Sequence, residues 1–174
     1  MSVFNIKSTY ITNRDAAPKV LTDAIQAKGD MMEVIGADRT SAAIIDAAST
    51  IKLVSVPSSA RLSDLHYFAQ SLGTSALDIA AWFPTTVPVG SGIVAAQLIS
   101  SSAFAANIAG VDTGIALTDG MGTIAQQSVP RRLQPLWQSL GLVSDPGIDI
   151  DLGFSVRTAT SVQGYVGLRA RFVR

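Results

Sequence analysis

Two alternating segments near the end of the chain constrain the fold more than any other feature of the sequence. Apolar and polar residues alternate through 148–157, and the alternation returns through 165–172. A period of two places the apolar side chains of a β-strand on one face and the polar side chains on the other. We therefore predict two antiparallel strands, each with one buried and one solvated face, joined as a hairpin through a loop at 159–161.

Shorter segments with strand character precede this pair. They are MMEVIG at 31–36, TIKLVSV at 50–56, residues 60–68 and residues 76–83, and proline, serine or glycine follows most of them. Neither face of 60–68 is cleanly apolar, which leaves the register of that strand open. Many short strands without a sustained helix predict an all-β fold, a jelly-roll-like antiparallel β-sandwich with one or two short helices.

The segment from 90 to 110 is apolar but ambiguous. Its alanine content favours a helix, and a strand at 93–98 is the alternative. Serine residues interrupt it well short of the roughly 18 apolar residues that a membrane span needs, so we predict no membrane partner. Weak strands are expected at 115–117 and 123–127.

Residues 1–28 differ from the rest, and we predict an extended N-terminal arm followed by a single sandwich domain over 29–174. Aromatic and β-branched residues are scattered through the arm without helical spacing, and proline and asparagine punctuate it. A disordered terminus is the alternative, although disordered tails are poor in such residues. A short helix is possible at 20–27.

The stretch PLWQSLGLVSDPG at 135–147 predicts one tight helical turn before the last two strands. Pro135 suits the first helical position, and Gly141 suits the left-handed residue that ends a helix. In that closure Leu142 contacts Trp137. We predict a structural plug that closes one end of the sandwich, with a ligand platform on Trp137 as the alternative. The plug residues are Leu136, Trp137, Leu140, Gly141 and Leu142.

The composition excludes several classes of function. The net charge is zero, which argues against nucleic acid as a partner. Charged residues make up 15% of the chain, against about 25% in typical soluble domains. We therefore expect a partner to cover part of the surface. The absence of cysteine rules out disulfides and thiolate chemistry.

No group of residues has the spacing of a catalytic or metal site. A single histidine, His66, lies within a predicted strand, so we expect a structural or solvent-facing role. Asp145 fits a turn, while Asp149 and Asp151 fall on the solvated face of a strand rather than in a calcium loop. The glycine-rich segment 110–122 lacks the phosphate-loop and dinucleotide patterns. We predict no catalytic residue, no metal, no cofactor and no small-molecule substrate.

Four stretches together resemble the small capsid decoration, or cement, proteins of tailed bacteriophages. They are NIKSTYITNRDAAP, STIKLVSVPSSARLSDL, LGTSALDIAAWF, and PLWQSLGL with a following DPG and a final GLRARFV. Their order spans nearly the whole chain. At AAQLISSSAFAAN the sequence departs from the acidic, aromatic segment expected of the family, so we infer no contact there.

The resemblance implies a non-enzymatic virion protein on the outer surface of an icosahedral capsid, assembled in the host bacterial cytoplasm. It implies that the chain clamps neighbouring major capsid proteins, as a homo-oligomer or among symmetric neighbours on the shell. An extended arm suits this task because it can add a strand to the sheet edge of a neighbour. The candidate contact residues of the arm are Phe4, Ile6, Tyr10, Ile11 and Arg14.

Two other classes of function remain as alternatives. A carbohydrate- or receptor-binding module of a phage tail or neck would need exposed aromatic residues beside a carboxylate, for which Trp82, Tyr67 and Asp78 are the candidates. A cupin-type enzyme would share the jelly-roll shape, but one histidine is too few for its metal site.

Overall fold

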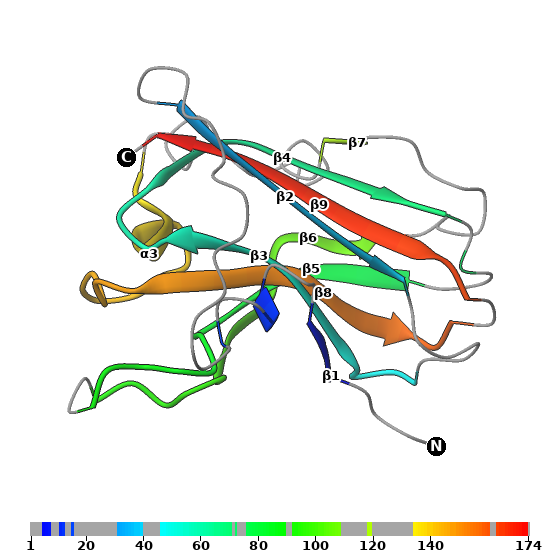
Figure 1. The fold of residues 1–174 in the computed structure, drawn as a ribbon, viewed down its shortest axis with the longest axis horizontal. Coiled ribbons are helices and arrows are strands. Elements are labelled where there is room, and N and C mark those ends of the chain that lie inside the picture. The colour runs from blue at the N-terminus through cyan, green and yellow to red at the C-terminus, as the bar shows by residue number, and fades with distance from the viewer. Residues whose placement is uncertain are drawn as a thin grey trace.

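The computed structural model of the chain describes residues 5–7, 11, 12, 15, 31–39, 46–70, 72, 76–89, 92–108, 118–119, 134–160 and 163–173. Two sheets pack face to face (Figure 1). The five-stranded sheet has the order β1(Asn5–Lys7), β3(Thr50–Pro57), β8(Asp149–Thr158), β5(Ala76–Trp82) and β6(Leu98–Ile108). The four-stranded sheet has the order β2(Met31–Arg39), β9(Tyr165–Val173), β4(Arg61–Ala69) and β7(Thr118–Asp119).

The predicted all-β antiparallel sandwich is confirmed. Within the described ranges every strand pair is antiparallel except β1 with β3. Alternate residues of both sheets point inward and form one hydrophobic core. Its fully buried side chains include Leu53, Leu65, Ile79, Phe154 and Leu168.

The predicted C-terminal hairpin is wrong. β8 lies in the five-stranded sheet and β9 in the four-stranded sheet, so the connection at 159–164 crosses between the layers (Figure 1). Each strand has two neighbours from other parts of the chain: β8 pairs with β3 and β5, and β9 pairs with β2 and β4. Because each layer needs an apolar inner face, both strands show the same alternation without pairing with each other.

A β-bulge explains why neither face of β4 is consistently apolar in the sequence. The register against β9 shifts between Leu62 and Asp64, which leaves Ser63 as the extra residue. The buried positions therefore change from Leu62 to Leu65 and Tyr67. A bulge inserts one residue and reverses the inward and outward positions after it.

The ambiguous segment from 90 to 110 contains a strand. This strand begins at Leu98, the residue where the alternative strand predicted at 93–98 was expected to end. β6 runs from Leu98 to Ile108 and pairs with β5. The strand predicted at 76–83 is β5, which ends one residue earlier, at Trp82, and the prolines at positions 84 and 88 follow it. The weak strand predictions at 115–117 and 123–127 lie outside the described residues, as does the short helix predicted at 20–27.

The predicted helical turn is present as α3(Leu136–Ser139). It begins one residue later than predicted, because Pro135 occupies the N-cap position rather than the first helical position. Gly141 has a φ of 75°, and the amides of Gly141 and Leu142 donate to the carbonyls of Gln138 and Trp137 at 2.9 and 3.0 Å. This is the predicted Schellman closure.

Candidate interaction surfaces

The β3–β4 turn binds α3 and fixes its position at one end of the sandwich. The amides of Leu136 and Trp137, which have no partner within a helix, donate to the carbonyls of Ala60 and Ser58 at 2.7 and 3.0 Å. The hydroxyl of Ser58 also hydrogen-bonds Asp145. The β3–β4 turn and α3, which are distant in sequence, therefore form one structural unit.

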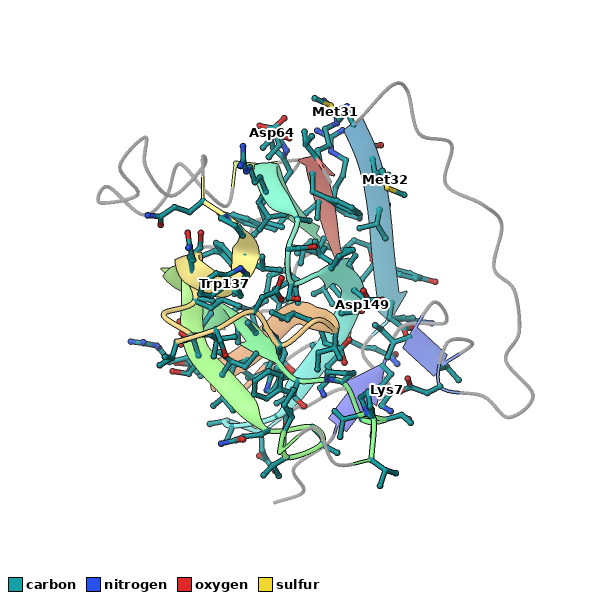
Figure 2. The ribbon with its side chains drawn as sticks, turned by 90° about the vertical axis from the view of Figure 1, so that its left-hand side faces the viewer. Lys7, Met31, Met32, Asp64, Trp137 and Asp149 are labelled. Carbon is teal, nitrogen blue, oxygen red and sulfur yellow. The ribbon has the colours of Figure 1, made fainter. Side chains whose placement is uncertain are left out.

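Leu136, rather than Trp137, fills the end of the core. Leu136 is 1% exposed and belongs to the core cluster, and Leu140 and Leu142 pack against it. Trp137 is only partly buried and lies at the side of α3 that faces the viewer in Figure 2. The plug thus depends on three leucines, with Trp137 as a partial cover.

The arm lies along the edge of its own sheet over its described residues. β1 pairs in parallel with β3, with Ile6 opposite Ile51. Lys7 Nζ lies 2.7 Å from Asp15 Oδ2 and 2.6 Å from Thr85 Oγ1. Thr85 Oγ1 donates in turn to Asp15 at 2.9 Å. These contacts join the arm to the β5–β6 connection.

The predicted contact residues of the arm are only partly within the described residues. Ile11 is fully buried in its own chain, so in this arrangement its side chain is not available to a partner. The backbone of Ile6 belongs to β1. Phe4, Tyr10 and Arg14 lie outside the described residues, and their contact with a partner stays a prediction.

The outer face of the five-stranded sheet is buried where the sequence predicted solvent. Asp149 is exposed as expected, but Asp151 is 0% exposed. Asp151 accepts a hydrogen bond from Ser55 Oγ at 3.2 Å and lies 3.7 Å from Lys52 Nζ. Lys52 also lies over the ring of Trp82, 5.6 Å from its centroid. The strict alternation of β8 therefore does not show that its polar face is exposed to solvent.

A pocket of about 370 Å³ opens beside this buried pair. Lys52, Trp82, Lys7, Thr85 and Leu98 are among the residues that line it. Both ammonium groups already have carboxylate partners within the chain, Asp151 for Lys52 and Asp15 for Lys7. The pocket is therefore apolar and electrically balanced rather than a site for an anion.

The outer face of the four-stranded sheet carries a cluster of charged side chains around Arg171. Arg171 forms an ion pair with Glu33, and its Nη1 lies 3.9 Å from Asp64 Oδ2. The hydrogen bond to Glu33 and the attraction of its charge raise the pKa of Arg171 above its already high value. Arg39 lies over the ring of Tyr165, 5.8 Å from its centroid.

The titratable side chains of the described residues are spread over the two sheets rather than gathered as metal ligands. They include no group of three or more metal-ligating side chains. His66 faces Arg169, with 3.3 Å between His66 Nδ1 and Arg169 Nη2. Among the described helices none is long and apolar enough to cross a membrane.

The three candidate carbohydrate contacts are buried rather than exposed. Trp82 is 3% exposed, while Tyr67 and Asp78 are each 6% exposed. Tyr67 belongs to the core between the sheets. The three residues named for the carbohydrate-binding alternative therefore do not form the exposed aromatic cluster that it would need, since both faces of β5 are covered.

The all-β sandwich defined by these layers is shared with a chain in one solved structure of a phage capsid. A chain in the structure entitled "Capsid of Ralstonia phage GP4" matches with a TM-score of 0.60 at 15% identity, over 97% of this chain and 97% of that chain. A chain of the cyanophage Pam1 capsid asymmetric unit matches with a TM-score of 0.43 at 16% identity, over 91% and 96% of the two chains. No protein-family model and no curated protein matches the sequence. The first likeness shows a common fold along almost the full length of both chains.

Proposed function

We propose that this chain is a non-enzymatic structural protein of a phage virion, which binds the outer surface of the capsid and cements neighbouring major capsid proteins. The observation that supports the proposal most directly is the fold shared with a chain of a phage capsid over 97% of both lengths. The order of the four family-like stretches in the sequence supports the same class of protein independently of the fold.

The surface of the molecule agrees with a structural role. The pocket beside the buried Lys52–Asp151 pair is electrically balanced, and on the outer face of the four-stranded sheet Arg171 is paired with Glu33 and lies near Asp64. A cement protein acts by adding buried area across subunit boundaries, and its many symmetric copies make each modest contact effective. The binding site of such a protein is then a surface on the outside of the shell.

The test is binding of the purified full-length chain to shells assembled without it. We expect the chain to sediment with the shells up to a fixed number of copies per shell, and the loaded shells to resist heating better than bare shells. Electron microscopy of the loaded shells should place the added density on the outer surface. A chain that stays in the supernatant, or density confined to the tail or neck, would contradict the proposal.

A further inference from the structure

The two sheets differ in how far their outer faces are covered. On the five-stranded sheet the outward side chains of Lys52, Asp78 and Asp151 are buried. On the four-stranded sheet most outward side chains of β2, β4 and β9 are exposed or partly exposed. Figure 1 shows these three strands as one outer layer, with no described helix or strand beyond them. Among the described elements, the open face of the sandwich is therefore that of the four-stranded sheet.

This open face carries large apolar side chains. Met31 and Ile35 of β2 are 45% and 53% exposed, and Tyr165 of β9 is 48% exposed. Phe68 of β4 is partly exposed, and its ring occupies the space that a side chain at Gly167 would need. These positions face outward because the residues that alternate with them pack in the core. Protein interfaces are enriched in aromatic residues, methionine and arginine, which is the composition found here.

Arg169 lies at the centre of the same face. It is the middle residue of β9(Tyr165–Val173), and β9 lies between β2 and β4. Ile35 is opposite Arg169 on one side and His66 is opposite it on the other. A partner that covers this face would therefore bury the guanidinium of Arg169.

Arg169 differs from its neighbour Arg171 in having no carboxylate partner within the described part of the chain. Arg171 is paired with Glu33 and lies near Asp64. The contact of Arg169 is instead with His66, with 3.3 Å between Nη2 and Nδ1, and Arg169 Nε is buried without a hydrogen-bond partner. A buried donor without an acceptor is unfavourable. A partner that supplies the acceptor would remove this cost.

The chemistry of Arg169 and His66 defines what such a partner must carry. A guanidinium can only donate hydrogen bonds, so His66 Nδ1 accepts and the ring proton lies on Nε2. The imidazole N–H is then a further donor beside the guanidinium. A carboxylate fits these donors, because its two oxygens match the fork of a guanidinium. Apolar side chains around the pair would exclude water and strengthen its attraction.

We propose that the outer face of the four-stranded sheet docks onto the major capsid protein and that a carboxylate of that protein binds Arg169, an inference that rests on the function proposed above. Charge complementarity favours this occupant over a second copy. A two-fold axis through the centre of this face would bring two Arg169 guanidiniums together, and like charges repel. Glu33 and Asp64 on the same face argue against a polyanion such as nucleic acid.

The first test compares full-length variants for binding to shells assembled without the chain. Arg169→Gln removes the central charge, and we expect its affinity for shells to fall by about tenfold or more. Arg169→Lys keeps the charge but loses the fork, so its affinity should fall less. The matched control is Arg61→Gln, which removes the same charge from the exposed first residue of β4. Its affinity should stay that of the unaltered chain.

Urea unfolding of the free variants separates binding from folding. Because Arg169 has no carboxylate partner within the described part of the chain, Arg169→Gln should leave the urea midpoint unchanged. If the midpoint falls, Arg169→Lys takes its place in the comparison of affinities. Equal binding by the unaltered chain and the variant used, or an equal loss for Arg61→Gln, would overturn the inference while the proposed function stands.

The second test identifies the carboxylate. Arg169→Lys places an amine at this position, and a carbodiimide couples that amine to a carboxylate in contact with it. We expect mass spectrometry of the loaded shells to find position 169 linked to an aspartate or glutamate of the major capsid protein. A link to Asp119, which β7 places opposite His66, or to a second copy would overturn the inference, as would the absence of any link. An unaltered chain that does not sediment with the shells would overturn the proposed function itself.

Discussion

The pair formed by Lys52 and Asp151 places opposite charges where almost no water reaches. The side chains are 8% and 0% exposed, and Ser55 and Trp82 provide further contacts. Removal of one member of a buried pair leaves the other charge without compensation, which is more costly than losing the pair as a whole. The stability of the five-stranded sheet should therefore depend on the charge of Asp151.

We expect Asp151→Asn to lower the free energy of unfolding by about 3–5 kcal/mol. The amide keeps the shape of the carboxylate but removes the negative charge that lies 3.7 Å from Lys52 Nζ. Urea unfolding monitored by tryptophan fluorescence measures the effect. The matched control is Asp149→Asn, two residues away and exposed, which should change stability by no more than about 0.5 kcal/mol. Equal effects of the two substitutions would show that the buried pair is not formed in solution.

These two aspartates also show how far the sequence reaches at the scale of single residues. Both occupy polar positions of the same alternating strand, so the pattern correctly assigned both to the outer face of β8. The pattern carries no information on what covers that face. Residues of β3 and β5, distant in sequence, bury Asp151 and leave Asp149 in solvent.

At the scale of elements, α3 is a single turn whose position depends on contacts with the β3–β4 turn. An isolated helix of this length is unstable in water. Hydrogen bonds from its first amides to Ser58 and Ala60, together with burial of Leu136, hold it in place. The helix is part of the sandwich core rather than a separate platform.

We expect Leu136→Ala to lower the free energy of unfolding by about 2–5 kcal/mol, because it opens a cavity in the core. Trp137→Ala should cost less, since Trp137 is only partly buried. Residue size alone would predict the larger loss of stability for Trp137→Ala, and we expect the opposite order. Chemical unfolding of the two variants side by side measures it, with circular dichroism as the probe because Trp137→Ala removes a fluorophore. A larger loss for Trp137→Ala would mean that the tryptophan closes the core.

Strand positions were largely predictable from the sequence, and strand partners were not. Residue types, alternation and turn signals located β2, β3, β4, β5, β8 and β9, and the turn chemistry around Gly141 predicted the Schellman closure of the helix. A local pattern does not reveal which distant strand supplies the neighbour. The strands β8 and β9 therefore looked like a hairpin, although they lie in different layers.

At the scale of the whole molecule, the arm joins parts of the chain that are distant in sequence. β1 occupies the edge of the five-stranded sheet, and Lys7 ties it to Thr85 in the β5–β6 connection. The sequence predicted an arm that serves a partner. Its described part contacts its own chain, and contact with a neighbour stays a prediction for the remaining residues.

We expect deletion of residues 1–18 to abolish or strongly weaken binding to shells, because the arm would supply a strand and apolar anchors to a neighbour. Co-sedimentation of the truncated chain with shells measures this. Since the deletion also removes β1 and the buried Ile11, urea unfolding is measured in parallel. Phe4→Ser/Tyr10→Ser provides a milder test with the chain length kept. Unchanged affinity of the truncated chain would show that the arm makes no contact with the shell.

The central positions of β8 and β9 have a consequence for synthesis on the ribosome. β8 separates β3 from β5 in one layer, and β9 separates β2 from β4 in the other. The earlier strands therefore emerge without the neighbours that hold them together, and neither layer can be completed before residues 149–173 leave the exit tunnel. Until then the nascent chain exposes unpaired edges and apolar faces, which are hazards for aggregation. A chain that stops short of this point should be degraded by proteases instead of folding.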